Sequence, residues 1–135
     1  MVEKKVQSFF NNPRNARKFG IKLAYLFGSA TDGRFGARSD LDIGVLFKKQ
    51  RKPKDILQKS ALLQIELGHQ IPRLIDLTIL NFVSPLLKHE VVHGRNMFAE
   101  RETTRAEFEK EVDREYAKYE KTLNRRFGRQ LWGSS

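Results

Sequence analysis

Two short segments of the chain are almost entirely apolar. Residues 21–27 read IKLAYLF and residues 41–47 read LDIGVLF, with glycine-containing sequence between them. Apolar runs of this length, bounded by turn residues, are typical of buried strands. The first run is apolar at nearly every position, as expected for a strand buried on both faces. The sequence therefore predicts an α/β fold in which helices flank a small mixed β-sheet.

Helical patterns occupy most of the remaining chain. A third strand is expected at 73–80, and a capping box at Thr104 and Glu107 marks the start of a long C-terminal helix. Apolar spacing, capping residues, prolines and glycines together predict the helices 2–11, 13–19, 53–70, 85–93 and 104–127.

Apolar stripes on these helices are expected to pack in the core. The stripe of the helix at 53–70 consists of Ile56, Leu57, Ala61, Leu62, Leu63, Ile65 and Leu67. The helix at 85–93 is expected to turn Leu86, Leu87, Val91 and Val92 inward. The C-terminal helix carries Phe108, Val112, Tyr116, Tyr119, Leu123 and Phe127, which we expect to cover the sheet, with part of the stripe available to a partner.

Length and composition favour one domain over residues 1–135, with a core at about 1–127 and a flexible tail at 128–135. No run approaches the roughly 20 apolar residues of a membrane span, and the N-terminus resembles no secretory signal. The chain has no cysteine, which excludes disulfides and thiolate metal sites. These features predict a cytoplasmic protein without a membrane partner.

Positive charge is in excess and unevenly distributed. The formal net charge is +10, and residues 1–50 contain ten Lys or Arg against four acids, whereas residues 101–135 contain nine against seven. A polyanionic ligand would suit this distribution, either a nucleoside triphosphate or a nucleic acid. Surface lysines that serve only solubility remain the alternative.

Asp40 and Asp42 are the first candidate site residues. They are two positions apart at the start of the second run, so on a strand they point to the same face. Two carboxylates that close raise each other's pKa, and a bound divalent cation such as Mg²⁺ would remove this repulsion. At the end of the first run, Gly28-Ser29 forms a turn whose backbone N–H groups and hydroxyl could hold phosphate oxygens.

Asp76 is a candidate third carboxylate. It lies among apolar residues of the expected third strand, and it would join Asp40 and Asp42 if that strand neighbours the second run. The alternative is a buried aspartate bonded to backbone. Taken singly, Gly-Ser is usually an ordinary turn and Asp-x-Asp a solvated strand edge. Their combination, ten residues apart between two strands, is much more specific.

This combination resembles a known family. Gly28-Ser29, ten residues and Asp40-Leu41-Asp42 match the signature of the nucleotidyltransferase superfamily that includes DNA polymerase beta. The stretches LFGSATDG and RSDLDIGVLF are similar to the minimal nucleotidyltransferases, the MntA-type antitoxins, over residues 1 to about 127. The resemblance implies a nucleotidyltransferase fold with a long C-terminal helix.

The same resemblance implies roles for the candidate residues. Asp40, Asp42 and Asp76 would hold two Mg²⁺ ions, and Asp76 would also help to deprotonate the acceptor. Gly28, Ser29, Arg38 and Ser39 would bind the nucleotide, although Arg34 and Arg38 are equally well read as exposed loop charges.

The resemblance also implies the reaction and the partner. AMP would pass from ATP to a tyrosine hydroxyl of a HEPN-domain toxin of the HepT type, which this antitoxin would silence. Three alternatives remain: a non-catalytic antitoxin with a vestigial nucleotide site, transfer to a small-molecule or nucleic-acid hydroxyl, and a nucleic-acid binder, which is least favoured.

His89 and His93 are four residues apart and could in principle bind zinc. No third ligand of a suitable type is expected nearby, so the sequence predicts no zinc site at this pair.

Overall fold

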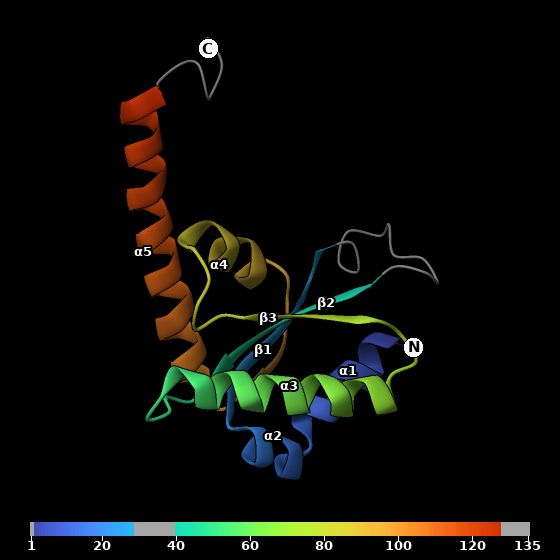
Figure 1. Ribbon diagram of the computed structural model, residues 1–135. Coiled ribbons are helices and arrows are strands. Elements are labelled where there is room, and N and C mark those ends of the chain that lie inside the picture. Colours follow the sequence, from blue (N-terminus) through green and yellow to red (C-terminus); the bar gives the residue numbers. More distant parts are fainter. Residues whose placement is uncertain (1, 29–39, 128–135) are drawn as a thin grey trace.

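The computed structural model describes residues 2–28 and 40–127, and this part of the chain forms five helices and four strands (Figure 1). In chain order these are α1 (Val2–Asn11), α2 (Pro13–Phe19), β1 (Ile21–Phe27), β2 (Leu41–Phe47), α3 (Pro53–Gln70), β3 (Ile75–Ile79), α4 (Pro85–Val92), β4 (Arg95–Ala99) and α5 (Glu102–Phe127). The prediction of an α/β fold with a long C-terminal helix is confirmed.

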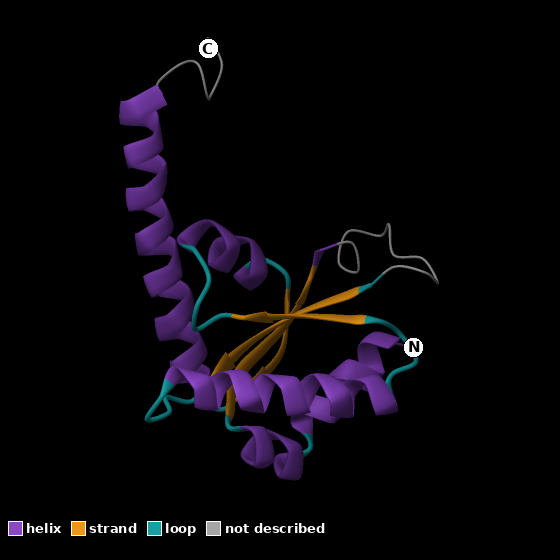
Figure 2. Cartoon of the chain, in the orientation of Figure 1, coloured by secondary structure: helices purple, strands orange, loops and turns teal. Residues whose placement is uncertain are grey.

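The four strands form one mixed sheet in the order β3-β2-β1-β4. Figure 2 draws these strands in orange, with helices around them. Strand β1 is antiparallel to both β2 and β4, whereas β2 and β3 are parallel. Parallel neighbours need a crossover, and α3 provides it between β2 and β3. Strands β2 and β3 therefore begin at the same end of the sheet, and β1 ends there.

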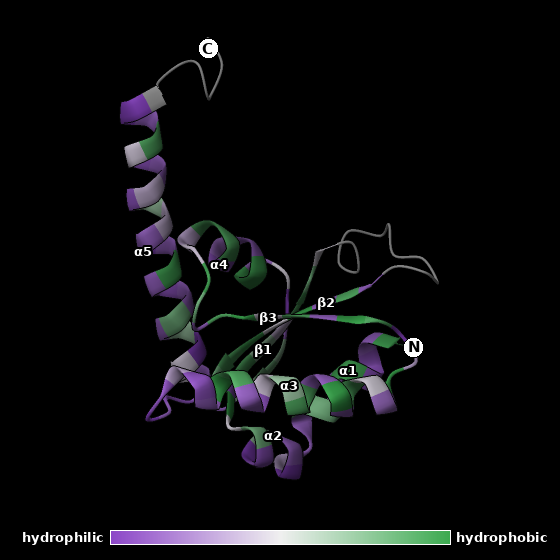
Figure 3. Ribbon diagram, viewed as in Figure 1, coloured by the Kyte–Doolittle hydropathy of each residue, from purple (hydrophilic) through white to green (hydrophobic). Residues whose placement is uncertain are grey.

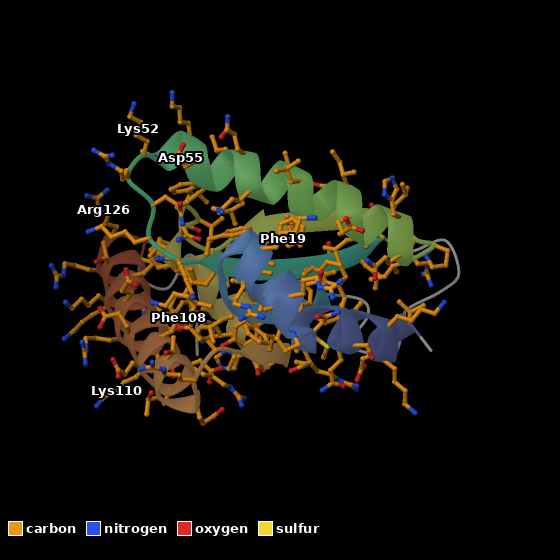
Figure 4. The ribbon with its side chains drawn as sticks, turned by 90° about the horizontal axis from the view of Figure 1, so that it is seen from below. Phe19, Lys52, Asp55, Phe108, Lys110 and Arg126 are labelled. Carbon is orange, nitrogen blue, oxygen red and sulfur yellow. The ribbon has the colours of Figure 1, made fainter. Side chains whose placement is uncertain are left out.

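Helices cover both faces of the sheet and create two apolar clusters. Helices α1, α2 and α3 pack on one face, where Figure 4 shows Phe19 of α2 close to α3. Helices α4 and α5 pack on the other face. The first cluster includes Val6, Phe10, Phe19, Ile43, Val45, Phe47, Leu63 and Leu67, and the second includes Leu23, Tyr25, Phe27, Leu80 and Val91.

The predicted helix boundaries follow from local capping. The side chain of Asn12 accepts a hydrogen bond from the first turn of α2, and Pro13 occupies the first helical position. Gly20 ends α2 in the left-handed region, at φ 62° and ψ 50°. Ser84 caps α4 in the same way as Asn12 caps α2.

Core packing of α3 was predicted too broadly. Leu57, Leu62 and Ile65 are each more than half exposed, whereas the buried positions of this helix include Leu63 and Leu67. The reason is that only one side of α3 faces the sheet, and the seven apolar residues extend well around the helix. Leu86 of α4 is likewise 48% exposed, so its predicted inward position is wrong.

The C-terminal region also differs from the prediction. Helix α5 begins at Glu102, so Thr104 and Glu107 lie inside the helix and form no capping box at its start. A fourth strand, β4, pairs with β1 and was not predicted. Among the apolar residues of α5, Val112 is buried, whereas Phe108, Tyr116, Tyr119 and Leu123 are only half-buried.

Helix α5 is largely hydrophilic, and its C-terminal turns extend beyond α4 (Figure 3).

The N-terminal half of α5 is held to the sheet by a buried polar contact. The hydroxyl of Tyr25 in β1 donates a 2.6 Å hydrogen bond to Oε2 of Glu109, which also accepts from Nε of Arg105 at 3.0 Å. Burial, and next the hydrogen bond to Glu109, raises the pKa of Tyr25 far above its ordinary value. None of the helices described is long and apolar enough to cross a membrane.

Candidate active site

The parallel pairing of β2 and β3 places two carboxylates side by side. Asp42 of β2 is the direct register partner of Asp76 of β3. The N–H of Leu41 donates to the carbonyl of Leu74 at 2.9 Å, which aligns the starts of the two strands. The sequence-based expectation that the third strand neighbours the second is therefore confirmed. Asp76 is exposed, so the alternative of a buried aspartate is wrong.

Asp40 completes the carboxylate group. It directly precedes β2 and is exposed, whereas Asp42 is half-buried. The charges of both Asp40 and Asp76 act on Asp42. The structure thus brings the three predicted carboxylates together at the end of the sheet where β2 and β3 begin.

Gly28 lies against this group, at the end of β1. Its φ of 75° belongs to the left-handed region, which glycine adopts without strain. Phe27 is the register partner of Asp42, so the chain turns beside that aspartate. The place that a Cβ atom of residue 28 would take is already filled by Oδ2 of Asp42. A glycine is therefore required here for the Asp42 carboxylate to keep its position.

Neighbouring carboxylates crowd Asp42. Burial raises the pKa of its carboxyl above the ordinary value, and the negative charges of Asp76, Asp40 and Glu90 raise it further, in that order. Protonation would relieve this repulsion, and so would a cation bound among the carboxylate oxygens.

Glu90 is a residue of the site that the sequence analysis missed. It belongs to α4, which packs closely on the sheet because Gly44 of β2 has no side chain. A Cβ atom at residue 44 would lie 2.5 Å from Cγ1 of Val91. Val91 thus occupies the space above Gly44, and Glu90 next to it approaches Asp42. No sequence motif indicates this neighbour, because it depends on how a helix packs.

The carboxylates fit a hard divalent cation. All the donor atoms are oxygens, the group is open to solvent at Asp40 and Asp76, and its charge is unbalanced at Asp42. Mg²⁺ usually binds through one or two carboxylates while its other positions hold water and substrate phosphate. Asp40, Asp42 and Asp76 are the residues that would hold it.

Three predicted nucleotide-binding residues, Ser29, Arg38 and Ser39, lie outside the described residues, as do Arg34 and the predicted tail at 128–135. The prediction that His89 and His93 lack a third ligand is wrong. The side chain of Asp113, from α5, reaches the histidine pair.

This geometry agrees with the family to which the sequence belongs. The family model described as "Polymerase beta, Nucleotidyltransferase" matches residues 4–104, well over half of the chain, and so includes Gly28, Asp40, Asp42 and Asp76. The chain is therefore a member of this nucleotidyltransferase family.

Solved structures share the fold over nearly the whole chain. A chain of a toxin-antitoxin crystal structure with AMP-PNP is 20% identical, with a TM-score of 0.68, and the match covers 97% of this chain and 99% of that one. A chain of the MntA-HepT toxin-antitoxin structure is 20% identical, with a TM-score of 0.61 and 96% coverage of both chains.

A third similar structure is described as the tri-AMPylated HEPN toxin of Shewanella oneidensis in complex with MNT antitoxin. It is 18% identical, with a TM-score of 0.65, and the match covers 97% of this chain and 99% of that chain. The search of curated proteins finds no match.

Proposed function

We propose that this protein transfers AMP from ATP to a tyrosine hydroxyl of a HEPN-domain toxin and thereby acts as its antitoxin. The observation that carries the proposal is the direct pairing of Asp42 with Asp76 beside Gly28, with Asp40 at the same end of the sheet. Membership of the nucleotidyltransferase family supports the reaction class. The toxin as acceptor is supported by the toxin-antitoxin complexes that share this fold.

The proposed reaction is an in-line displacement at the α-phosphorus of ATP. The acceptor oxygen forms a bond to this phosphorus, and the bond from phosphorus to the oxygen that bridges the α- and β-phosphates breaks. Pyrophosphate leaves with the electron pair of the broken bond. The proton of the acceptor hydroxyl passes to the carboxylate of Asp76, which is exposed and so can meet a macromolecular acceptor.

The other proposed residues position the metal ions and the nucleotide. Asp40, Asp42 and Asp76 would hold two Mg²⁺ ions, which would neutralise the charge that develops on the phosphate oxygens. Because Gly28 has no Cβ atom, the Asp42 carboxylate can occupy the space beside it. Gly28, Ser29, Arg38 and Ser39 are the proposed contacts to the nucleotide. Because the reaction consumes ATP, the proposal also places the protein in the cytoplasm.

Label transfer tests the proposal. The protein is incubated with Mg²⁺, the HEPN toxin encoded beside it and ATP labelled at either the α- or the γ-phosphate. We expect the α-label alone to appear on the toxin, and Asp42→Asn to reduce the rate by about 10²–10³-fold or more. Replacement of the accepting tyrosine by phenylalanine should remove the label.

Asp55→Asn is the matched control. Asp55 lies in the first turn of α3, at the opposite end of the sheet from the start of β2 (Figures 1 and 4). The same loss of one negative charge there should leave transfer unchanged. If toxin neutralisation proceeds without label transfer and is equal in the Asp42→Asn variant, the protein is instead a non-catalytic interaction module.

A further inference from the structure

A second group of metal-ligating side chains lies between α4 and α5. His89 of α4 and His93, which follows its last residue, are one helical turn apart. Asp113 belongs to α5, which packs against α4. One ligand atom from each of the three side chains lies within 4.8 Å of the other two. The group combines two imidazoles with a carboxylate, so it differs chemically from the all-oxygen group at Asp42.

The His93 ring is already oriented as a metal-binding histidine would be. Its Nδ1 lies 2.8 Å from the carbonyl oxygen of His89. Because a carbonyl can only accept, Nδ1 carries the hydrogen, and the lone pair of the neutral ring is on Nε2. Histidines that bind metals almost always donate their other ring N–H in this way, which fixes the tautomer and raises the basicity of the ligand nitrogen.

The His89 ring is held by stacking. It lies 3.7 Å from the ring of Tyr116 in α5, with 13° between the planes, and 4.2 Å from the ring of His93. His89 is half-buried, whereas His93 and Asp113 are exposed. One ligand is therefore held by packing and a second, His93, by its hydrogen bond to the His89 carbonyl, while the exposed Asp113 is free to approach a bound ion.

The small movement that binding needs is compatible with this exposure. In a tetrahedral zinc site with bonds of about 2.0–2.1 Å, ligand atoms are about 3.4 Å apart. The observed separations of up to 4.8 Å must shorten by about 1.4 Å at most. Rotation of the exposed Asp113 side chain, with a small tilt of the His93 ring that keeps its hydrogen bond, can supply this change.

The sequence around the pair is His89-Glu90-Val91-Val92-His93, which is the His-Glu-x-x-His spacing of helical zinc sites. In zinc peptidases the glutamate of this motif acts on a metal-bound water. Here the charge of Glu90 acts on Asp42, at the other metal-binding group. The spacing of the two histidines therefore supports metal binding at this position.

We propose that His89, His93 and Asp113 bind a zinc-class divalent ion, with water in the fourth position, and that the ion fastens α5 to α4. Borderline cations such as Zn²⁺ and Co²⁺ prefer nitrogen-containing ligand sets, whereas Mg²⁺ prefers oxygen alone. The two groups therefore select different metals. This site does not depend on the proposed AMP transfer.

Titration with Zn²⁺ and Co²⁺ tests the site. The protein carries Asp40→Asn and Asp42→Asn throughout, so that the carboxylate group cannot contribute. We expect one equivalent of Zn²⁺ to bind in calorimetry, a raised melting temperature, and visible Co²⁺ absorption of the intensity typical of four- or five-coordinate ions. His93→Ala and Asp113→Asn should each weaken binding at least about tenfold.

His69→Ala is the matched control, because His69 is exposed near the end of α3 and belongs to no such group among residues 2–28 and 40–127. It should bind Zn²⁺ as the parent does. Melting temperatures in EDTA should be equal for the parent and both site variants, which shows that each is folded. Binding that is absent in the parent, or equal in His93→Ala and Asp113→Asn, would overturn the proposal.

Discussion

Replacement of Gly28 by alanine tests whether this glycine makes room for the Asp42 carboxylate. Its effect on the carboxylate can be distinguished from its effect on the stability of the fold. The new Cβ would clash with Oδ2 of Asp42 and would lie 3.2 Å from its Cγ. To restore ordinary van der Waals contact, the carboxylate oxygen must move by about 1 Å. Misplacement of a catalytic group by that distance costs about 10²-fold in rate.

A backbone cost accompanies this displacement. Alanine at the φ of 75° found at Gly28 should destabilise the fold by about 1–2 kcal/mol, or about 4–8 °C in melting temperature for a chain of this size. Gly20→Ala is the matched control, since Gly20 has a φ of 62° but a Cβ there would lie no closer than 3.8 Å to other atoms. Gly20→Ala should be destabilised by a similar amount but should keep its full activity.

Two measurements distinguish the variants. Thermal melting should show comparable losses for Gly28→Ala and Gly20→Ala. In Gly28→Ala alone, binding of Mn²⁺, followed by electron paramagnetic resonance, should be weakened, and label transfer from α-labelled ATP should be about 10²-fold slower. Full metal binding and activity in Gly28→Ala would refute the argument that this glycine makes room for Asp42. An equal loss of activity in Gly20→Ala would refute it as well.

Because burial and neighbouring carboxylates raise the pKa of Asp42, the folded protein without metal loses stability as the pH rises above the ordinary value of 3.8. In EDTA, Asp42→Asn should therefore be more stable than the parent in urea at pH 7, and this gain should disappear below about pH 4. Glu90→Gln should lower the pKa of Asp42, because it removes one of the charges that raise this pKa. Mn²⁺ binding should then persist to lower pH. An unchanged pH dependence of Mn²⁺ binding would contradict the placement of Glu90. Tyr25→Phe should cost about 1–3 kcal/mol in urea unfolding, because Glu109 loses a buried donor.

Local chemistry made several elements predictable from sequence. Helix α2 starts and ends where Asn12, Pro13 and Gly20 indicate, because capping depends on a few adjacent residues. The α3 boundaries, Pro53 and Gln70, also agree with the prediction. By contrast, the burial of α3 was predicted incorrectly at Leu57 and Leu62, since apolar character does not reveal how much of a helix its neighbours cover.

The residues of the candidate site also differ in how far the sequence could predict their positions. Asp40 and Asp42 share a face because of the two-residue period of a strand, which is a property of the sequence once the strand is recognised. The pairing of Asp42 with Asp76 required the parallel register of β2 and β3, and that register was expected only on condition that the strands are neighbours.

What the sequence determined by itself was therefore the set of short-range features: the apolar strands, the capped helices and the spacing of Gly28, Asp40 and Asp42. Tertiary structure alone decided that Glu90 approaches Asp42 and that Asp113 reaches His89 and His93. The reason is how far along the chain each kind of interaction acts. Turns, caps and strand periodicity act over a few residues, whereas the packing of α4 on the sheet and of α5 on α4 brings together side chains that are far apart in the chain.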